Sequence, residues 1–272
     1  MSAVLDTSGV SVRFGGVHAL SDVDLQVQPG QLVGLIGPNG AGKTTFIDAI
    51  TGFVPSTGSV RLEGTDLTHM APDERAHRGL TRTWQAAELF DDLTVRENLT
   101  VAARRASWRD TVRDIFRGAT LRDERVDAAL ELLQLQEYAD VLPTELTQGQ
   151  RKLVGVARAL AAQPHVVCLD EPAAGLDTTE SEDLGRHLRT VVNEGTAMLL
   201  IDHDMGLVLS ICDHVVVLEF GKVIAQGSPD QVTRDPKVIE AYLGGAGAEV
   251  ADEVRAAAAE AHGGHDGGAA PA

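Results

Sequence analysis

The sequence is poor in cysteine, and this shortage excludes two classes of protein. Its two cysteines are Cys168 and Cys212. Two residues so far apart provide neither a disulfide framework nor the paired spacing of a structural metal site. Cys168 lies inside an apolar run and Cys212 in a predicted helix. We therefore interpret both as packing residues of a protein in a reducing compartment.

Basic residues are also scarce. The 272 residues include 23 Lys and Arg against 40 Asp and Glu, which gives a formal net charge of −17. A protein that binds nucleic acid in general needs a basic face, so this charge argues against that function. It also disfavours direct adhesion to anionic lipid.

Long hydrophobic runs are missing as well. No apolar stretch approaches the roughly 18 residues of a membrane span. The N-terminus has no cationic segment followed by an apolar run, which is what a secretion signal requires. The sequence therefore predicts a soluble, cytoplasmic protein, unless a partner holds it at a membrane.

Glycine is abundant where the chain has its clearest motif. Residues 37–45 read Gly-Pro-Asn-Gly-Ala-Gly-Lys-Thr-Thr, which fits the phosphate-binding pattern G-x-x-x-x-G-K-[ST]. The apolar run 32–36 before it predicts a buried strand, and Phe46, Ile47 and Ile50 after it recur at helical spacing. A strand, a glycine-rich turn and a helix are the context that this pattern requires.

The loop offers several kinds of group to a phosphate. Its backbone amides and the N-terminus of the following helix attract an anion, while Lys43 adds a full charge and Thr44 a hydroxyl for Mg²⁺. The candidate nucleotide-binding residues are Gly37, Pro38, Asn39, Gly40, Ala41, Gly42, Lys43, Thr44 and Thr45.

Acidic residues follow two apolar runs later in the chain. Residues 165–171 end in Asp170-Glu171, and the run 197–201 is followed by Asp202-His203-Asp204. Parallel strands deliver polar side chains to one crevice at their carboxyl ends. We therefore expect both clusters to lie at the same edge of a sheet as the phosphate-binding loop.

The rest of the chain divides into four parts. Residues 10–14, 23–27 and 59–63 predict an antiparallel flank, and residues 215–218 and 222–225 predict a hairpin. Between the two β-containing halves, helices are predicted at 95–105, 108–116, 121–136 and 148–162, and their interspersed charges favour a solvated or partner-facing surface. Beyond residue 243 the Gly- and Ala-rich composition predicts a disordered tail.

Phe14 stands at the end of the first predicted strand. From its position alone, a ring that stacks on a nucleotide base and a ring buried in the core are equally good interpretations. The choice between them depends on how exposed the side chain is.

A further motif narrows the function. Residues 146–151, Leu-Thr-Gln-Gly-Gln-Arg, followed by 153–160, resemble the LSGGQ signature of the ABC ATPase family. The resemblance covers about residues 5–243. It identifies Gln85 with the Q-loop, Asp170-Glu171 with the end of the Walker B strand, and residues 174–177 with the D-loop. His203 corresponds to the switch histidine and Phe14 to the base-stacking position. Thr147 stands where the family usually has Ser.

Within that family the chain looks most like the LivG-type ATPases of branched-chain amino-acid importers. The likeness rests on Arg-Thr-Trp-Gln at 82–85, Leu-Thr-Val-Arg-Glu-Asn-Leu at 93–99, Ile-Asp-His-Asp-Met at 201–205 and the ending at 234–244. An ATPase of an exporter or a lipid transporter is the alternative within the transport class. A soluble ABC protein that works on DNA or ribosomes is the alternative outside it, and the acidic single cassette speaks against it.

The resemblance implies a P-loop NTPase (RecA-like) α/β core with an antiparallel β flank and a helical subdomain inserted at about 86–160. It implies one ATPase domain over 1–243 and a tail over 244–272. Lys43, Glu171 and His203 would act in ATP hydrolysis, and Thr44, Gln85 and Asp170 would hold Mg²⁺. Thr147, Gly149, Gln150 and Asp177 would act on the ATP of a second ATPase subunit, identical or paralogous.

The remaining partners that the resemblance implies are transmembrane permease subunits and, indirectly, a solute-binding protein. No nucleic acid is among them. The expected location is the cytoplasmic side of the cell membrane, as a peripheral subunit.

Overall fold

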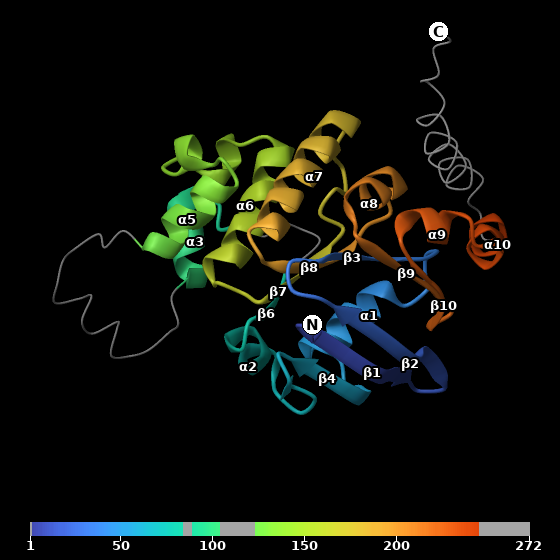
Figure 1. Cartoon of the computed structure of the whole chain (residues 1–272). Coiled ribbons are helices and arrows are strands. Elements are labelled where there is room, and N and C mark those ends of the chain that lie inside the picture. Colours follow the sequence, from blue (N-terminus) through green and yellow to red (C-terminus); the bar gives the residue numbers. More distant parts are fainter. Residues whose placement is uncertain (1, 84–88, 104–122, 245–272) are drawn as a thin grey trace, which may run out of the picture.

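The computed structural model describes residues 2–83, 89–103 and 123–244 (Figure 1). Gln85, the helix predicted at 108–116 and residues 245–272 lie outside these ranges. None of the helices in the described ranges is long and apolar enough to cross a membrane.

The central sheet has six strands in the order β10-β9-β3-β8-β7-β6. The bounds are β3 (Leu32–Ile36), β6 (Leu80–Arg82), β7 (Val166–Asp170), β8 (Ala197–Ile201), β9 (His214–Glu219) and β10 (Lys222–Gly227). Five strands are parallel, and β10 pairs antiparallel with β9 in the predicted hairpin. Every residue of β3, β7 and β8 is buried, as expected for parallel strands covered on both faces.

A second sheet is antiparallel, with the order β2-β1-β4-β5. Its strands are β1 (Leu5–Phe14), β2 (Val17–Val27), β4 (Thr57–Leu62) and β5 (Thr65–Asp66). The predicted antiparallel flank is therefore confirmed, although β1 and β2 begin several residues earlier than the alternating pattern indicated.

Alternation along the central strands divides the apolar side chains between two cores. Leu32 and Ile36 of β3 belong to one core, and Val33 and Leu35 belong to the other. The second core lies between the two sheets and contains Phe46 of helix α1 (Lys43–Thr51). Figure 1 shows α1 between the sheets, with α7 (Thr178–Asn193) and α8 (Met205–Ile211) on the other side of the central sheet. The phosphate-binding loop is thus fixed between two packed layers.

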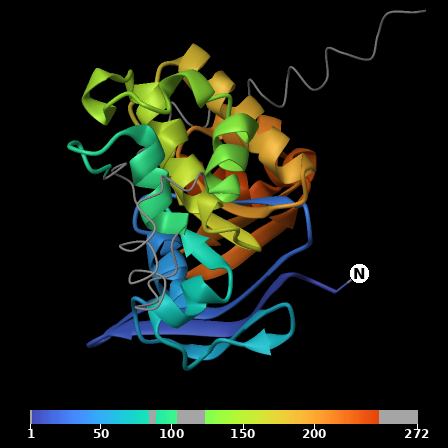
Figure 2. The ribbon, with the colours of Figure 1, turned by 90° about the vertical axis from the view of Figure 1, so that its left-hand side faces the viewer.

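The helical block forms a lobe of its own beside the sheets (Figures 1 and 2). It contains α3 (Val95–Ala103), α5 (Glu124–Leu132), α6 (Gln148–Ala161) and the short 3₁₀ turns η1 (Gln136–Tyr138) and η2 (Pro143–Glu145). The helix predicted at 121–136 is shorter at its end, because Gln134 adopts a left-handed φ of 57° and the amide of Leu135 turns back to Leu130 O. The helix predicted at 148–162 is confirmed by α6.

Three short helices complete the described chain: α2 (Pro72–His77), α9 (Pro229–Thr233) and α10 (Pro236–Gly244). Pro begins each of them, with its fixed φ at the first helical position. Cys212 follows α8 as its C-cap and is not within the helix, but it is buried, as is Cys168. Both cysteines pack in the core, as the sequence indicated.

Candidate functional site

The phosphate-binding loop runs from the end of β3 into α1, and two of its glycines are required by space as well as by backbone angle. A Cβ on Gly37, where φ is 147°, would lie 2.0 Å from Leu218 O. A Cβ on Gly42, where φ is 104°, would lie 2.8 Å from Ala19 O. Gly42 is also the N-cap of α1, and no side chain caps that end. The first amides of α1 are therefore left for a ligand.

Lys43 is folded onto its own loop. Its Nζ donates to Gly37 O at 2.6 Å and to Pro38 O at 3.1 Å. Burial lowers the pKa of Lys43, and the nearby charges of Glu171 and Asp170 oppose this shift. The ammonium group therefore lies against the loop and near two acids, Asp170 at the end of β7 and Glu171 directly after it.

Asp170, the last residue of β7, is buried beside a cation. Arg82 Nη2 lies 3.3 Å from Asp170 Oδ2, while Asp170 Oδ1 is buried and has no hydrogen-bond partner among the described residues. Burial raises the pKa of Asp170 to about 6, and Arg82 acts against this shift. A buried carboxylate oxygen without a partner fits a hydrated Mg²⁺, which prefers oxygen ligands. Thr44, whose hydroxyl the sequence predicts for the same metal site, is the second residue of α1.

Glu171 follows in an uncommon backbone conformation. Its φ is 50°, in the left-handed region that non-glycine residues rarely adopt, and its amide donates to Ile201 O at 2.7 Å. Such conformations occur at functional sites because the surrounding structure holds them in place. The charges of Asp170 and Glu171 both act on the ammonium of Lys43, so both carboxylates lie near the phosphate-binding loop.

The end of β8 brings His203 to the same edge. Asp202 is buried, and its carboxylate accepts hydrogen bonds from the amides of Ala173 and Asp204, both at 3.0 Å. His203 Nδ1 lies 3.6 Å from Asp202 Oδ1, and the imidazole is 65% exposed. The sequence pointed to His203 but gave no separate role to Asp202, which fixes the segments after β7 and β8 relative to each other.

Phe14 is 52% exposed at the end of β1. This exposure excludes the interpretation of a core ring. The ring is free to stack on a planar ligand, which is the other interpretation that the sequence left open.

The remaining predicted residues gather at the starts of α6 and α7. Thr147 and Gln150 form a reciprocal capping box, with Gln150 N donating to Thr147 Oγ1 at 3.2 Å and Thr147 N donating to Gln150 Oε1 at 2.9 Å. Asp177 caps α7 through Glu180 N at 2.9 Å. Gly149 faces Glu180, whose Oε1 would lie 3.3 Å from an added Cβ. Within the described ranges, no hydrogen bond or ion pair joins Thr147, Gly149, Gln150 or Asp177 to the phosphate-binding loop.

Sequence reasoning missed two residues that support the site. Arg82 pairs with Asp48 of α1 as well as with Asp170. Tyr242 of α10 is buried with its Oη 3.9 Å from Met205 Sδ, and the backbone of Gly37 lowers the pKa of the phenol against the stronger effect of burial. Neither belongs to a phosphate-binding pattern, and only the fold brings them to it.

The comparisons agree with this geometry. The model of the ABC transporter family matches residues 20–174, and that of the branched-chain amino acid ATP-binding cassette transporter family matches residues 222–248. The chain belongs to the ABC transporter family of ATPases.

Among the relatives of this chain are proteins whose names concern the transport of branched-chain amino acids. The high-affinity branched-chain amino acid transport ATP-binding protein BraF of Pseudomonas aeruginosa is 39% identical over 89% of this cassette and 98% of its own length. LivG of Escherichia coli, described in the same words, is 38% identical over the same shares.

Solved structures show the same fold. A nucleotide-free ATP-binding cassette from an ABC transporter superposes with a TM-score of 0.77 and 33% identity, over 89% of this cassette and 99% of that chain. A dimeric bacterial ABC transporter cassette superposes with a TM-score of 0.67 and 25% identity, over 83% and 98%. The expected α/β fold, with its antiparallel flank and its block of helices, is confirmed.

Proposed function

We propose that this cassette hydrolyses ATP to drive the import of branched-chain or related amino acids through membrane permease subunits, with a solute-binding protein delivering the amino acid. The observation that carries the proposal is the similarity to branched-chain amino acid transporters along most of the chain. The chain resembles BraF and LivG over nearly their whole length, and residues 222–248 match the model of the branched-chain amino acid ATP-binding cassette transporter family.

The chemistry on the cassette's own side begins with binding. The backbone N–H groups of the loop, which Pro38 lacks, and the ammonium of Lys43 hold the phosphates, while Phe14 stacks on the base. Thr44, with Gln85 and Asp170 acting through water, would hold Mg²⁺, which would neutralise charge on the phosphates. Asp170 brings a buried oxygen with no other partner in the described chain to this task.

The attack of water on ATP involves the residues next to the metal-binding acid. Glu171 accepts a proton from the attacking water, because it follows the metal-binding acid directly and stands at the same strand end. His203, exposed beside the buried Asp202, donates a hydrogen bond to the γ-phosphate or to that water. Lys43 leaves its two loop carbonyls to meet the phosphates.

The second half of the site comes from another subunit. Thr147, Gly149 and Gln150 begin α6, Asp177 begins α7, and these residues have no partner on the phosphate-binding loop of their own chain. We propose that they close over the ATP bound by a second ATPase subunit, so that ATP holds two cassettes together. One ATPase domain over residues 1–243, with its helical subdomain at about 86–160, is then one half of the working unit.

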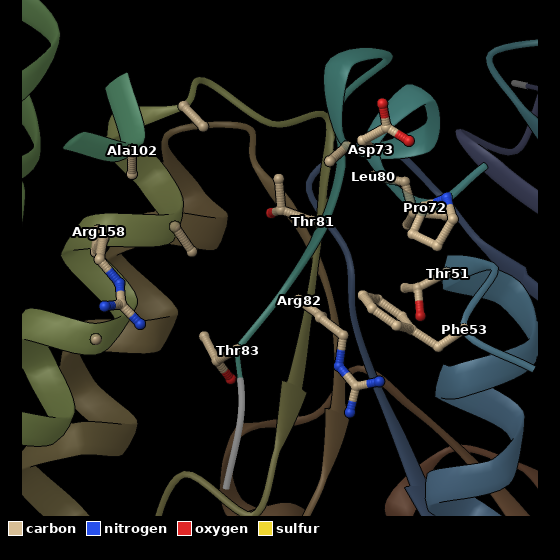
Figure 3. A pocket seen from close by; sticks show the side chains of 14 residues that line it. Thr51, Phe53, Pro72, Asp73, Leu80, Thr81, Arg82, Thr83, Ala102 and Arg158 are labelled. Atoms are coloured by element: carbon tan, nitrogen blue, oxygen red, sulfur yellow. The ribbon is translucent and has the colours of Figure 1, made fainter. Parts of the chain in front are cut away.

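The membrane subunits have a candidate docking place between the two lobes. A groove of about 540 Å³ is lined by residues of α2 and β6 on one side and of α3 and α6 on the other (Figure 3). Phe53, which is 48% exposed, lies at this groove. A short apolar segment of a permease seated here would contact the core and the helical block together. The cassette would then work at the cytoplasmic face of the membrane.

The test is purification from membranes through a tag on the cassette, followed by reconstitution of the bound proteins in vesicles. We expect permease subunits to remain bound, and ATP inside the vesicles with a solute-binding protein outside to drive uptake of radiolabelled leucine, isoleucine or valine. Lys43→Ala is the matched control and should support no uptake. Bound membrane proteins that take up none of these amino acids would show a different transported solute.

A further inference from the structure

One side chain of β6 lies in both the groove and the nucleotide site. Arg82 lines the groove, and Figure 3 shows its side chain beside the ring of Phe53. Its Cζ lies 5.5 Å from the centre of that ring, which is within the range of a cation–π contact. Thr81 and Thr83, its neighbours in sequence, line the same groove.

The same guanidinium holds two carboxylates on its other side. It pairs with Asp48 of α1 and with Asp170 of β7, and its side chain is 6% exposed. A guanidinium is planar, with donors in a fixed fork, so its orientation restricts both acids together. Asp170 is held through Oδ2, which leaves Oδ1 without a partner among the described residues.

Arg82 is therefore held by residues of three different segments. Asp48 belongs to the helix that follows the phosphate-binding loop, Asp170 ends β7, and Phe53 follows α1 at the edge of the groove.

We propose that Arg82 is a positioning residue that orients Asp170 for the metal. The role rests on the metal site of the proposed function and concerns the cassette alone.

The positioning role is tested with Mn²⁺ in place of Mg²⁺. Electron paramagnetic resonance of the full-length cassette with bound ADP gives the Mn²⁺ dissociation constant without any turnover. Arg82→Met should raise this constant by about ten-fold, since removing an outer partner of a metal ligand usually costs 10- to 100-fold in metal affinity. Arg82→Lys keeps the charge but not the fork, so its constant should lie in between.

Two controls separate positioning from general damage. The affinity for a fluorescent nucleotide in EDTA should change less than two-fold in both variants, because the metal plays no part in it. Arg186→Met removes an exposed arginine that pairs with Asp183 and should leave Mn²⁺ binding unchanged. If Arg82→Met does not fold, Arg82→Lys and Asp48→Asn carry the test. Mn²⁺ affinity equal to that of the wild type in the folded variants overturns the positioning role.

The outcomes remain distinguishable. If the wild-type cassette with bound ADP does not bind Mn²⁺, the metal site of the proposed function fails. If the wild type binds Mn²⁺ and the Arg82 variants bind it equally well, only the role of Arg82 is overturned.

Discussion

Helices α1 and α6 both begin at residues that the sequence assigns to ATP, but their N-termini differ. Gly42 begins α1 in a left-handed conformation and gives it no side-chain cap. Thr147 begins α6 with a closed capping box, in which Gln150 returns a bond to the backbone of Thr147. An uncapped helix start can bind an anion with its own amides. A capped start has already used one of them.

The difference indicates that the two helix ends have different tasks. The uncapped start of α1 leaves its amides available to a phosphate. At α6 the amide of Gln150 is taken by Thr147. In the dimer proposed above, a phosphate held by another subunit would therefore meet the remaining amides of the first turn, Gly149 and the threonine hydroxyl. We expect such a site to recognise an ATP that is already bound elsewhere better than a free one.

A buried arginine holds the C-terminal end of α1. Arg75 of α2 is buried and donates from Nη1 to Ala49 O at 3.0 Å and to Ile50 O at 2.7 Å, in the last turn of α1. It donates further to Thr68 O and Met70 O. A cation at a helix C-terminus satisfies carbonyls and complements the helix dipole. Arg75 thus fixes the C-terminal end of α1, while the N-terminal end of the same helix stays open to a ligand.

The largest effect is expected at Glu171, the proposed general base of ATP hydrolysis. Glu171→Gln keeps the size of the side chain but removes its basicity, so kcat should fall by about 10³-fold, within the usual range for a general base. ATP should still bind, and should then hold two chains together in light scattering at micromolar protein. Glu194→Gln, an exposed substitution at the end of α7, is the control. Turnover like that of the wild type would falsify the role of Glu171.

Breaking the support behind α1 should have the next largest effect. Arg75→Met leaves buried carbonyls without their charged donor, which should cost about 3 kcal/mol of unfolding free energy. For a domain of this size that corresponds to a melting temperature lower by about 6–12 °C. Arg78→Met, at an exposed arginine just after α2, should change it by less than about 2 °C. A similar loss in both variants would show that the contacts of Arg75 are not what stabilises α1.

The third prediction concerns the start of α6. Thr147→Arg places a bulky cation where the partner's phosphate approaches, so ATPase activity should fall by about 10²-fold, comparable to the loss of one donor to a transition-state oxyanion. Nucleotide binding by the same chain should be unchanged, because Thr147 makes no bond to its phosphate-binding loop. Thr147→Ser keeps the hydroxyl and should behave like the wild type. Full activity in Thr147→Arg would mean that the start of α6 does not meet ATP.

The smallest effect is expected from the cap itself. Thr147→Ala removes the hydroxyl that accepts from Gln150 N and should lower the unfolding free energy by about 1 kcal/mol, the usual worth of an N-cap. Chemical denaturation of Thr147→Ala beside Thr147→Ser measures it. If the two variants unfold alike, the box seen at α6 contributes nothing, and the two helix ends are less different than their geometry indicates.

The sequence predicted those parts of the candidate site whose residues lie close together in the chain. Residues 37–45 fix their own shape, and the apolar runs before Asp170 and His203 specify buried parallel strands, whose ends must meet at one edge. It was also right about the hairpin and about α6, whose apolar periodicity is strong. These are local patterns, which need no knowledge of the packing.

What the sequence could not predict depends on contacts between distant elements. Nothing near Arg82 indicates that it reaches Asp48 and Asp170, which are 34 and 88 residues away. Phe14 was equally compatible with core and surface until its exposure was known. The end of α5 depends on a left-handed turn at Gln134, a residue whose side chain gives no strong turn signal. The roles of Gln85 and of residues 245–272 stay predictions.

The bonds that Lys43 makes within its own loop have a further consequence. Its ammonium already has two carbonyl oxygens, so binding a nucleotide is an exchange of partners and not an addition of one. The loop acts as a competitor that is always present, and a ligand displaces it only by offering more negative charge than two neutral carbonyls do. We expect adenosine to gain nothing from this lysine and each further phosphate to gain more, so that the empty loop discriminates between nucleotides before any second subunit arrives.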